Sequence, residues 1–480
     1  MFNCRWLFLW VCLLCLLDTA LLSIKQLNKS GAAHRCFCEL DGQVDDCNCK
    51  VESVASFNNI KIAPRLQIIL TRNFFKFFKV NLDKSCPFWS DDSVCALRSC
   101  AVCPCTDEQV PCGLKEEEGI AHGKEKYYPQ TDEESSSDKS CDSRTNEEIR
   151  LSALDTTISK ENEAVFRTWT EHDDISVTFC ELDDEQSVGM QYVDLTLNPE
   201  RYTGYKGKSA WRIWNSIYNE NCFKPEPVNA KGYKSLLSEK SVKVSQYLKG
   251  MCLEKRVFYR LISGLHSSIN IHLCAHYLLS GGMFGVETFG PSVDEFQKRF
   301  DPETTDGEGP IRLKNLYFTY LVVLRALAKT APLLGQESFY TGETAEDAEL
   351  KNEITEILEV VKQFPNHFNE STMFQGDKLQ AKILKEEFRN HFLNISRIMD
   401  CVGCDKCKLW GKLQIQGLGT ALKILFTSPD KLNLGRQEII SLFNGFGRLS
   451  SSIHKVQEFQ ALLSEDTSRK VNSPGKSPFL

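Results

Sequence analysis

Residues 251–280 read MCLEKRVFYRLISGLHSSINIHLCAHYLLS. Apolar side chains recur in this stretch at intervals of three and four residues, a spacing that places them on one face of an α-helix. The same periodicity appears in the later segments 311–330, 346–363, 376–400 and 417–427. Polar and apolar residues alternate over 191–197, which predicts a strand. We therefore expect a mainly α-helical fold with few short strands.

The composition indicates a globular protein. The chain has 480 residues, of which 42% are apolar and 25% charged, so it can bury a substantial core. Its net charge of -7 argues against nucleic acid as a partner, because nucleic-acid binders usually carry a basic surface. No repeat of 20 to 50 residues is apparent, which disfavours a solenoid. We expect one helical core over residues 151–465 and a disordered tail over 466–480.

Two unusual segments precede this core. Residues 24–112 form a cysteine-rich N-terminal region, with ten of the 21 cysteines between 36 and 112. Residues 113–150 are rich in Glu, Asp, Ser and Lys and hold almost no large aliphatic side chains. Such a composition cannot bury enough apolar surface to become ordered, so we expect an acidic flexible loop with a regulatory role.

The N-terminus predicts entry into the secretory pathway. An apolar run over 6–17 follows Arg5, as in a signal peptide, and it is too short to span a bilayer. We assign residues 1–23 to this signal; an uncleaved signal anchor is the alternative. Cleavage would leave 18 of the 21 cysteines in an oxidising compartment where disulfides persist. Glycosylation sequons at Asn28, Asn369 and Asn394 are compatible with this route.

Four cysteines near residue 42 predict a bridged hairpin. One antiparallel register about Gly42 places Cys36 opposite Cys49 and Cys38 opposite Cys47. Residues two apart on a strand face the same side, so the two bridges would stack. A four-thiolate zinc site is the alternative, but zinc sites favour wider cysteine spacing and a reducing compartment.

Two further groups of cysteines have the spacing of exchangeable pairs. Cys401, Cys404 and Cys407 lie three residues apart at the edge of a helical pattern, where a helix N-terminus favours thiolate. One of the three would then pair elsewhere. A structural loop with long-range bridges is the alternative.

The second group is Cys95 and Cys100, followed closely by Cys103, Cys105 and Cys112. This density predicts a flexible loop with competing pairings, in which labile bridges have the higher reduction potentials. A rigid disulfide knot is the alternative.

Two exchangeable pairs need an electron acceptor. Thiols reduce oxygen poorly without a cofactor, so a flavin is the natural hypothesis. No dinucleotide-binding fingerprint is present, since residues 417–422 lack the third glycine and no βαβ pattern precedes them. The flavin would have to bind among helices.

Four sequence runs carry a family resemblance. CPFW at 86–89, NPERYTGYKG at 198–207, RLISGLH at 260–266 and CVGC at 401–404 resemble the endoplasmic reticulum oxidoreductins, which are FAD-dependent thiol oxidases. The likeness extends from Cys36 to about Ser451. It implies a single helical domain enclosing FAD, in the lumen of the endoplasmic reticulum, and is compatible with peripheral association with the lumenal membrane face.

The resemblance implies a route for electrons. Cys404 and Cys407 would be the active-site pair beside the flavin, and Cys95 and Cys100 the shuttle pair. The shuttle would oxidise protein disulfide isomerase and related thioredoxin-like oxidoreductases, and FAD would pass the electrons to O2, giving H2O2.

The resemblance also implies cofactor contacts and bridges. The flavin contacts would be Arg201, Thr203, Trp214, Ser263, His266, Arg299 and Arg312. The implied bridges are Cys86–Cys401, Cys222–Cys252 and the regulatory pairs Cys95–Cys141 and Cys100–Cys105. Cys103, Cys112 and Cys274 are additional to the family pattern, and Cys180 looks unpaired. His272 and His276 have the spacing of metal ligands but lack a third ligand, so we expect no metal.

Two other functions remain as alternatives from the sequence. One is a disulfide-rich secreted binding glycoprotein without redox turnover. The other is a flavin-free disulfide exchanger of thioredoxin type, which is disfavoured because no βαβ pattern surrounds either cysteine pair.

Overall fold

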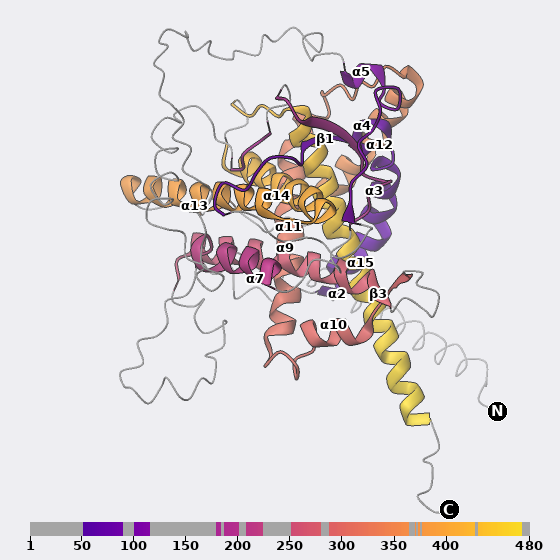
Figure 1. The fold of residues 1–480 in the computed structure, drawn as a ribbon, viewed down its shortest axis with the longest axis vertical. Helices are drawn as coiled ribbons and strands as arrows, with labels where there is room; N and C mark the ends of the chain where they lie inside the picture. Colours follow the sequence, from indigo (N-terminus) through magenta and orange to yellow (C-terminus); the bar gives the residue numbers. More distant parts are fainter. Residues whose placement is uncertain are drawn as a thin grey trace, which may run out of the picture.

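The computed structural model describes residues 51–89, 100–115, 179–183, 187–200, 208–223, 251–279, 288–363, 370, 373–374, 377–427 and 431–472. The expected signal peptide and bridged hairpin lie outside these ranges, as does most of the expected acidic loop. Helices dominate the described part, and the few strands are short, as the sequence predicts (Figure 1).

Five long helices and the shorter α7 surround the candidate active site that is described in the next subsection. They are α7 (Lys208–Asn215), α9 (Leu253–Ala275), α11 (Glu308–Leu334), α13 (Lys378–Ile398), α14 (Asp405–Phe426) and α15 (Arg436–Asn472). Around them lie α2 (Val51–Phe57), α3 (Ala63–Ile69), α4 (Asn73–Lys76), α5 (Cys112–Lys115), α10 (Val293–Phe300) and α12 (Thr344–Gln363). Single turns of other helix types are η2 (Asn58–Ile62), η5 (Ser216–Glu220) and η7 (Met399–Cys401).

Two crossings between central helices depend on glycine. A β-carbon at Gly417 of α14 would overlap the carbonyl oxygen of Ser441 on α15. A β-carbon at Gly264 of α9 would overlap the side chain of Thr319 on α11. Both backbones can approach so closely only because these positions have no side chain. The two close crossings fix α9, α11, α14 and α15 as one packed unit.

Two small antiparallel sheets accompany the helices. β1 (Phe77–Asn81) pairs with β2 (Met190–Asp194), which overlaps the predicted strand at 191–197, and β3 (Tyr277–Leu279) pairs with β4 (Thr288–Gly290). Pro104 forms an isolated bridge with Val193 of β2. The segment around Pro104 is therefore held against this sheet.

The segment before β1 belongs to the same core as the long helices. Asn58 donates from Nδ2 to the carbonyl oxygen of Ser450 on α15 at 3.0 Å, and Ser450 donates from Oγ to Asn58 Oδ1 at 2.7 Å. α15 itself continues to Asn472, beyond residue 465, where the sequence predicts that a tail begins.

α11 is the central apolar helix. Among the described residues it alone has the length and apolarity to cross a membrane, but most of its apolar segment is buried inside the protein. In Figure 1 it passes behind α14 through the middle of the molecule. Its burial identifies it as a core helix of this fold.

Candidate active site

Cys404 and Cys407 form a disulfide at the start of α14. Cys404 is the N-cap residue, and its sulfur accepts a hydrogen bond from the backbone N–H of Cys407 at 3.4 Å. Its carbonyl oxygen accepts from the N–H of Lys408 at 2.7 Å. Both cysteines are buried. Because unpaired N–H groups and the helix dipole favour negative charge at an N-terminus, this position stabilises a thiolate when the bridge opens.

A second disulfide lies directly beside this pair. Cys401 is bonded to Cys86, so the third cysteine of the motif pairs with a residue 315 positions away. The backbone N–H of Trp89 donates to the sulfur of Cys86 at 3.2 Å, and Trp89 is itself buried. The bridge fastens the 86–89 segment to η7, just before the exchangeable pair.

A cluster of buried and half-buried charges lies beside this second bridge. Lys412 of α14 donates to Asp400 at 2.6 Å and lies 3.0 Å from Asp183, while Lys84 lies 3.7 Å from Asp400. Burial raises the pKa of the Asp400 carboxyl, against the attraction of Lys412. Burial alone would lower the pKa of Lys84, but the surrounding carboxylates outweigh it and raise that pKa. These ion pairs join three chain segments next to Cys401.

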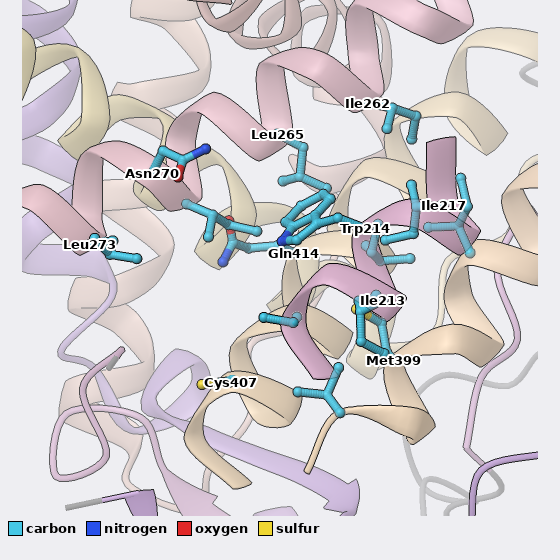
Figure 2. A pocket seen from close by; sticks show the side chains of 16 residues that line it. Ile213, Trp214, Ile217, Ile262, Leu265, Asn270, Leu273, Met399, Cys407 and Gln414 are labelled. Carbon is cyan, nitrogen blue, oxygen red and sulfur yellow. The ribbon is translucent and has the colours of Figure 1, made fainter. Parts of the chain in front are cut away.

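A pocket opens beside the active-site pair. Cys407 and Gly411 line it from α14, Trp214 from α7 and Leu265 from α9. Figure 2 places Trp214 at the centre of the pocket, near Leu265 and Gln414. Most of the lining is apolar, as in small-molecule and cofactor sites. The pocket therefore suits a flat, largely apolar ring system next to a reactive sulfur.

An aromatic pair extends the pocket wall. The rings of Trp214 and His266 are stacked, with centroids 3.5 Å apart and planes 16° apart. His266 Nδ1 is 3.1 Å from the hydroxyl of Tyr218 on η5. Burial, together with the weaker effect of the nearby cations Arg312 and Arg299, lowers the pKa of His266 to about 3. The imidazole is neutral at physiological pH.

The two arginines adjoin the same region. Arg299 donates from Nε to Asn270 Oδ1 at 3.2 Å and is paired with Glu295. Arg312 donates from Nη1 to the carbonyl oxygen of Arg299 at 3.2 Å. Asn270 lines the pocket, so the guanidinium of Arg299 lies immediately behind its wall. Guanidinium groups are suited to binding a pyrophosphate.

The structure groups the expected cofactor contacts that it describes. They lie on four helices: Trp214 on α7, Ser263 and His266 on α9, Arg299 on α10 and Arg312 on α11. Trp214 lines the pocket, His266 stacks on it, and Arg312 and Arg299 lie close enough to His266 to lower its pKa. The remaining two, Arg201 and Thr203, lie outside the described residues. Also outside are Cys36, Cys38, Cys47, Cys49, Cys95, Cys141 and Asn369. The sequon residue Asn394 is half-buried on α13.

A buried ion pair near the pocket has no counterpart in the sequence prediction. Arg448 of α15 pairs with Glu200, and its guanidinium lies 4.9 Å from the ring centre of Trp410. Gln414, a pocket residue, donates from Nε2 to Glu200 Oε1 at 3.1 Å. Burial lowers the pKa of Arg448 to about 9. Glu200 lies in the NPER run, but nothing in the sequence indicates a partner as distant as Arg448.

The regulatory pairing of Cys100 with Cys105 is not present. Cys100 is in a disulfide, whereas Cys105 is a thiol, so the two are not bonded to each other. The backbone N–H of Cys105 donates to the carbonyl oxygen of Tyr192 at 2.7 Å, which holds this residue against β2. Burial, followed by the charge of Asp194, raises the pKa of the Cys105 thiol. The prediction of this bridge is wrong for the state described here.

Cys222 and Cys252 are likewise not joined to each other. Cys222 is buried just after η5, while Cys252 is exposed at the N-cap of α9. The two thiols therefore lie in different environments, and the implied bridge is absent.

The remaining described cysteines divide by exposure. Cys103 and Cys112 are exposed thiols, and Cys180 and Cys274 are buried thiols. Burial raises the pKa of Cys274 to about 12 and also raises that of Cys180, so both are poorly reactive. His272 is hydrogen-bonded in the core, with Nε2 3.0 Å from the carbonyl oxygen of Arg448.

Comparison with known proteins gives a consistent result. The family model described as Endoplasmic Reticulum Oxidoreductin 1 matches residues 61–456. ERO1-like protein alpha of Mus musculus is 50% identical over 445 residues, which cover 90% of this chain and 93% of the relative. The Homo sapiens protein of that name is 50% identical over 449 residues, with the same two coverages. Ero1-like protein of Drosophila melanogaster is 47% identical over 460 residues, or 91% of this chain and 93% of the relative.

A solved structure is also similar. The structure of Ero1p, described as the source of disulfide bonds for oxidative protein folding in the cell, matches with a TM-score of 0.54 and 28% sequence identity. The match covers 87% of this chain and 99% of that one.

Proposed function

The chain belongs to the endoplasmic reticulum oxidoreductin 1 family, thiol oxidases that generate disulfide bonds for oxidative protein folding, and from this premise we propose how its own residues perform that reaction. The Cys404–Cys407 bridge is the inner redox pair, and the pocket beside Cys407 holds FAD. The observation that supports this most directly is that Cys407 forms part of the pocket wall at the N-terminus of α14.

The residues around the pocket fit a flavin dinucleotide. The apolar wall and the Trp214–His266 stack suit the faces of aromatic rings, and Arg299 and Arg312 suit the pyrophosphate. Ser263 adds a hydroxyl on the same helix as His266, and Arg201 and Thr203 would complete the set. When bound, FAD supplies a two-electron acceptor for the dithiol and a path for those electrons to O2, which is reduced to H2O2.

The protein residues control how electrons reach this site. A thiolate of the shuttle pair, Cys95 and Cys100, attacks the Cys404–Cys407 bridge and forms a mixed disulfide. The second shuttle thiol then attacks that mixed disulfide, which leaves the shuttle oxidised and the inner pair as a dithiol. The N-terminus of α14 stabilises the thiolate released at this pair.

A relay is needed because the inner pair is enclosed. Cys404 is 0% exposed and Cys407 only 3% exposed, so a folded protein cannot reach either sulfur directly. We propose that the shuttle pair exchanges with protein disulfide isomerase and related thioredoxin-like proteins at the surface. The acidic segment 113–150 and Cys141 would restrain the shuttle when Cys141 is bonded to Cys95.

The cofactor assignment is tested by the colour of the protein. The purified mature chain should be yellow and show a flavin absorption spectrum. Trp214→Ala removes the central ring of the pocket and should yield folded protein depleted of flavin. A matched control is Trp211→Ala, because Trp211 lies on the same helix but is 54% exposed. A folded wild-type protein without any flavin would refute the cofactor assignment.

A further inference from the structure

Asn198 joins the segment that carries Cys100 to the helix that carries the inner redox pair. Its Oδ1 accepts from the backbone N–H of Cys103 at 3.2 Å, and its Nδ2 donates to the carbonyl oxygen of Cys103 at 3.4 Å. On the other side, Trp410 of α14 donates from Nε1 to the carbonyl oxygen of Asn198 at 2.7 Å. Asn198 and Trp410 are both buried, so water competes little for these bonds.

The turn that follows β2 holds Asn198 in this position. Both the backbone N–H and Nδ2 of Asn198 donate to the carbonyl oxygen of Asp194, at 3.1 Å and 2.9 Å. The orientation of the amide follows from its partners, because a carbonyl oxygen can only accept and a backbone N–H can only donate. Oδ1 must face the N–H of Cys103, and Nδ2 must face the two carbonyl oxygens. The side chain is therefore preorganised toward Cys103.

The two residues after Cys103 bind the neighbouring sheet. Pro104 forms the bridge with Val193 of β2, and Cys105 donates from its backbone N–H to the carbonyl oxygen of Tyr192 at 2.7 Å. With Cys103 held as well, three consecutive residues have fixed backbones. The chain that leads back to the shuttle cysteine therefore starts from a fixed point.

The lengths of chain on both sides of Asn198 are short. Cys100 precedes Cys103 by three residues, which span at most about 11 Å when fully extended. Cys407 precedes Trp410 by three residues of α14, which is a rise of about 4.5 Å. Asn198 lies between these two tethers, so it sets the distance and direction from which the segment of Cys100 approaches the inner pair.

We propose that Asn198 is a positioning residue for electron transfer between the two cysteine pairs, which docks the segment of Cys100 on the helix of the inner pair. This role rests on the proposed relay, in which the shuttle dithiol becomes a disulfide and the Cys404–Cys407 disulfide becomes a dithiol. Two electrons and two protons pass inward in that step. One sulfur must meet another in a defined direction, and a misplacement of about 1 Å can slow such a step about 100-fold.

Asn198→Asp changes these contacts without changing the size of the side chain. A carboxylate can still accept from the N–H of Cys103, but it cannot donate to a carbonyl oxygen. It would therefore repel the carbonyl oxygens of Cys103 and Asp194. The segment of Cys100 should then move away from α14.

The two exchange steps of the relay can be followed separately in the holoenzyme. Reduced protein disulfide isomerase is mixed with the oxidised enzyme in the absence of oxygen, and thiols are alkylated at increasing times and counted by mass spectrometry. Thiols at Cys100 report the first exchange, between isomerase and shuttle. Thiols at Cys404 and Cys407, together with reduced flavin, report the electrons that have reached the inner pair.

In Asn198→Asp, Cys100 should be reduced at least as fast as in the wild type, whereas the inner pair should receive electrons at least about tenfold more slowly. Asn444→Asp should leave both rates unchanged. It is the matched control, since Asn444 is also buried and its Nδ2 also donates to two carbonyl oxygens, those of Phe75 and Ile440. A wild-type inner rate in Asn198→Asp would overturn the proposal. Equal slowing of both steps would also overturn it, because general damage to the fold slows both.

Trp410→Phe covers the case in which Asn198→Asp does not fold. Phenylalanine keeps an aromatic ring beside Arg448 but removes the N–H that binds the carbonyl oxygen of Asn198. The loss of this one hydrogen bond should slow the inner step about fivefold and leave the first exchange unchanged. Trp211→Phe is the control, because Trp211 is exposed on α7. A wild-type inner rate in Trp410→Phe would overturn the link between Asn198 and α14.

Cys100→Ala separates the role of Asn198 from the relay on which it rests. If isomerase still reduces the inner pair of Cys100→Ala at the wild-type rate, Cys100 is not part of the relay, and the relay and the role of Asn198 are overturned together. If Cys100→Ala is blocked while Asn198→Asp is as fast as the wild type, the relay stands and only the role of Asn198 is overturned.

Discussion

Two disulfides meet at the start of α14, and they differ in loop length and in the groups closest to them. Cys86–Cys401 joins residues 315 positions apart, beside the buried ion pairs of Lys412. Cys404–Cys407 joins residues three positions apart, at a helix N-terminus and against a pocket. Only two residues separate Cys401 from Cys404 along the chain.

The comparison shows that the environment of a bridge, more than the bond itself, determines its role. A bridge that closes a long loop removes much conformational freedom from the unfolded chain, which stabilises the fold. A bridge that closes a very short loop removes little, but a helix N-terminus favours its opening to a thiolate. We therefore expect substitutions at Cys404–Cys407 to affect mainly turnover and substitutions at Cys86–Cys401 to affect mainly stability.

The largest effect should come from Cys407→Ala. Without its inner pair the protein has no dithiol beside the pocket, so oxygen consumption with reduced protein disulfide isomerase should fall by roughly 1000-fold or more. The free energy of unfolding should fall by about 2 kcal/mol or less, because the closed loop is so short. Oxygen-electrode assays and urea unfolding measure the two quantities. Turnover near the wild-type rate would contradict the assignment of the inner pair.

The double variant Cys86→Ala/Cys401→Ala should lose much stability but little turnover. In the chain-entropy description, the loss of so long a loop closure destabilises the protein by about 5 kcal/mol. The folded fraction should still oxidise a small dithiol, with turnover reduced by less than about tenfold. The double substitution leaves no odd thiol behind to exchange with the active pair. An unchanged stability with complete loss of turnover would show that this bridge also exchanges.

Lys412→Met tests how much the ion pairs beside the Cys86–Cys401 bridge stabilise the protein. It leaves the carboxylates of Asp400 and Asp183 without their principal cation, and breaking such a buried pair should cost about 3 kcal/mol of unfolding free energy. Lys362→Met is the control, since Lys362 pairs with Glu359 on the exposed face of α12 and should contribute less than about 1 kcal/mol. Equal effects in the two variants would mean that the cluster does not stabilise the bridge region.

The sequence predicts which segments are helical better than it predicts where the active-site helix α14 begins. Periodicity predicts 251–280 closely, because α9 has a continuous buried stripe. It predicts a helix only from 417, whereas α14 begins at Asp405. The missed turns contain Lys406, Lys408 and Lys412, and these lysines interrupt the apolar pattern. Lys412 is buried all the same, because the carboxylates that neutralise it come from elsewhere in the chain.

The site is predictable where its residues belong to local motifs. Trp214 and His266 follow from the family resemblance, and the structure stacks them on each other beside the pocket that Cys407 also lines. The pairing of Arg448 with Glu200 could not be found in this way, because it depends on a contact between distant parts of the chain. Disulfide partners pose the same problem: spacing cannot assign them, and the implied Cys100–Cys105 and Cys222–Cys252 pairs are absent.

The smallest expected effect is a loss of stability at acidic pH, caused by His266 beside the pocket of the exchangeable pair. The pKa of His266 is lowered from 6.5 to about 3 in the folded protein, by burial and then by Arg312 and Arg299. Between these values the unfolded chain binds a proton that the folded chain does not, so stability decreases as the pH falls below 6.5. From pH 7 to pH 5 the loss from this group should be about 2 kcal/mol.

His266→Gln isolates this contribution, because an amide does not titrate and the other groups change equally in both proteins. Urea unfolding at pH 7 and pH 5, at one fixed concentration of FAD, should show the wild type losing about 2 kcal/mol more than the variant. Equal losses would mean that folded His266 takes up a proton by pH 5.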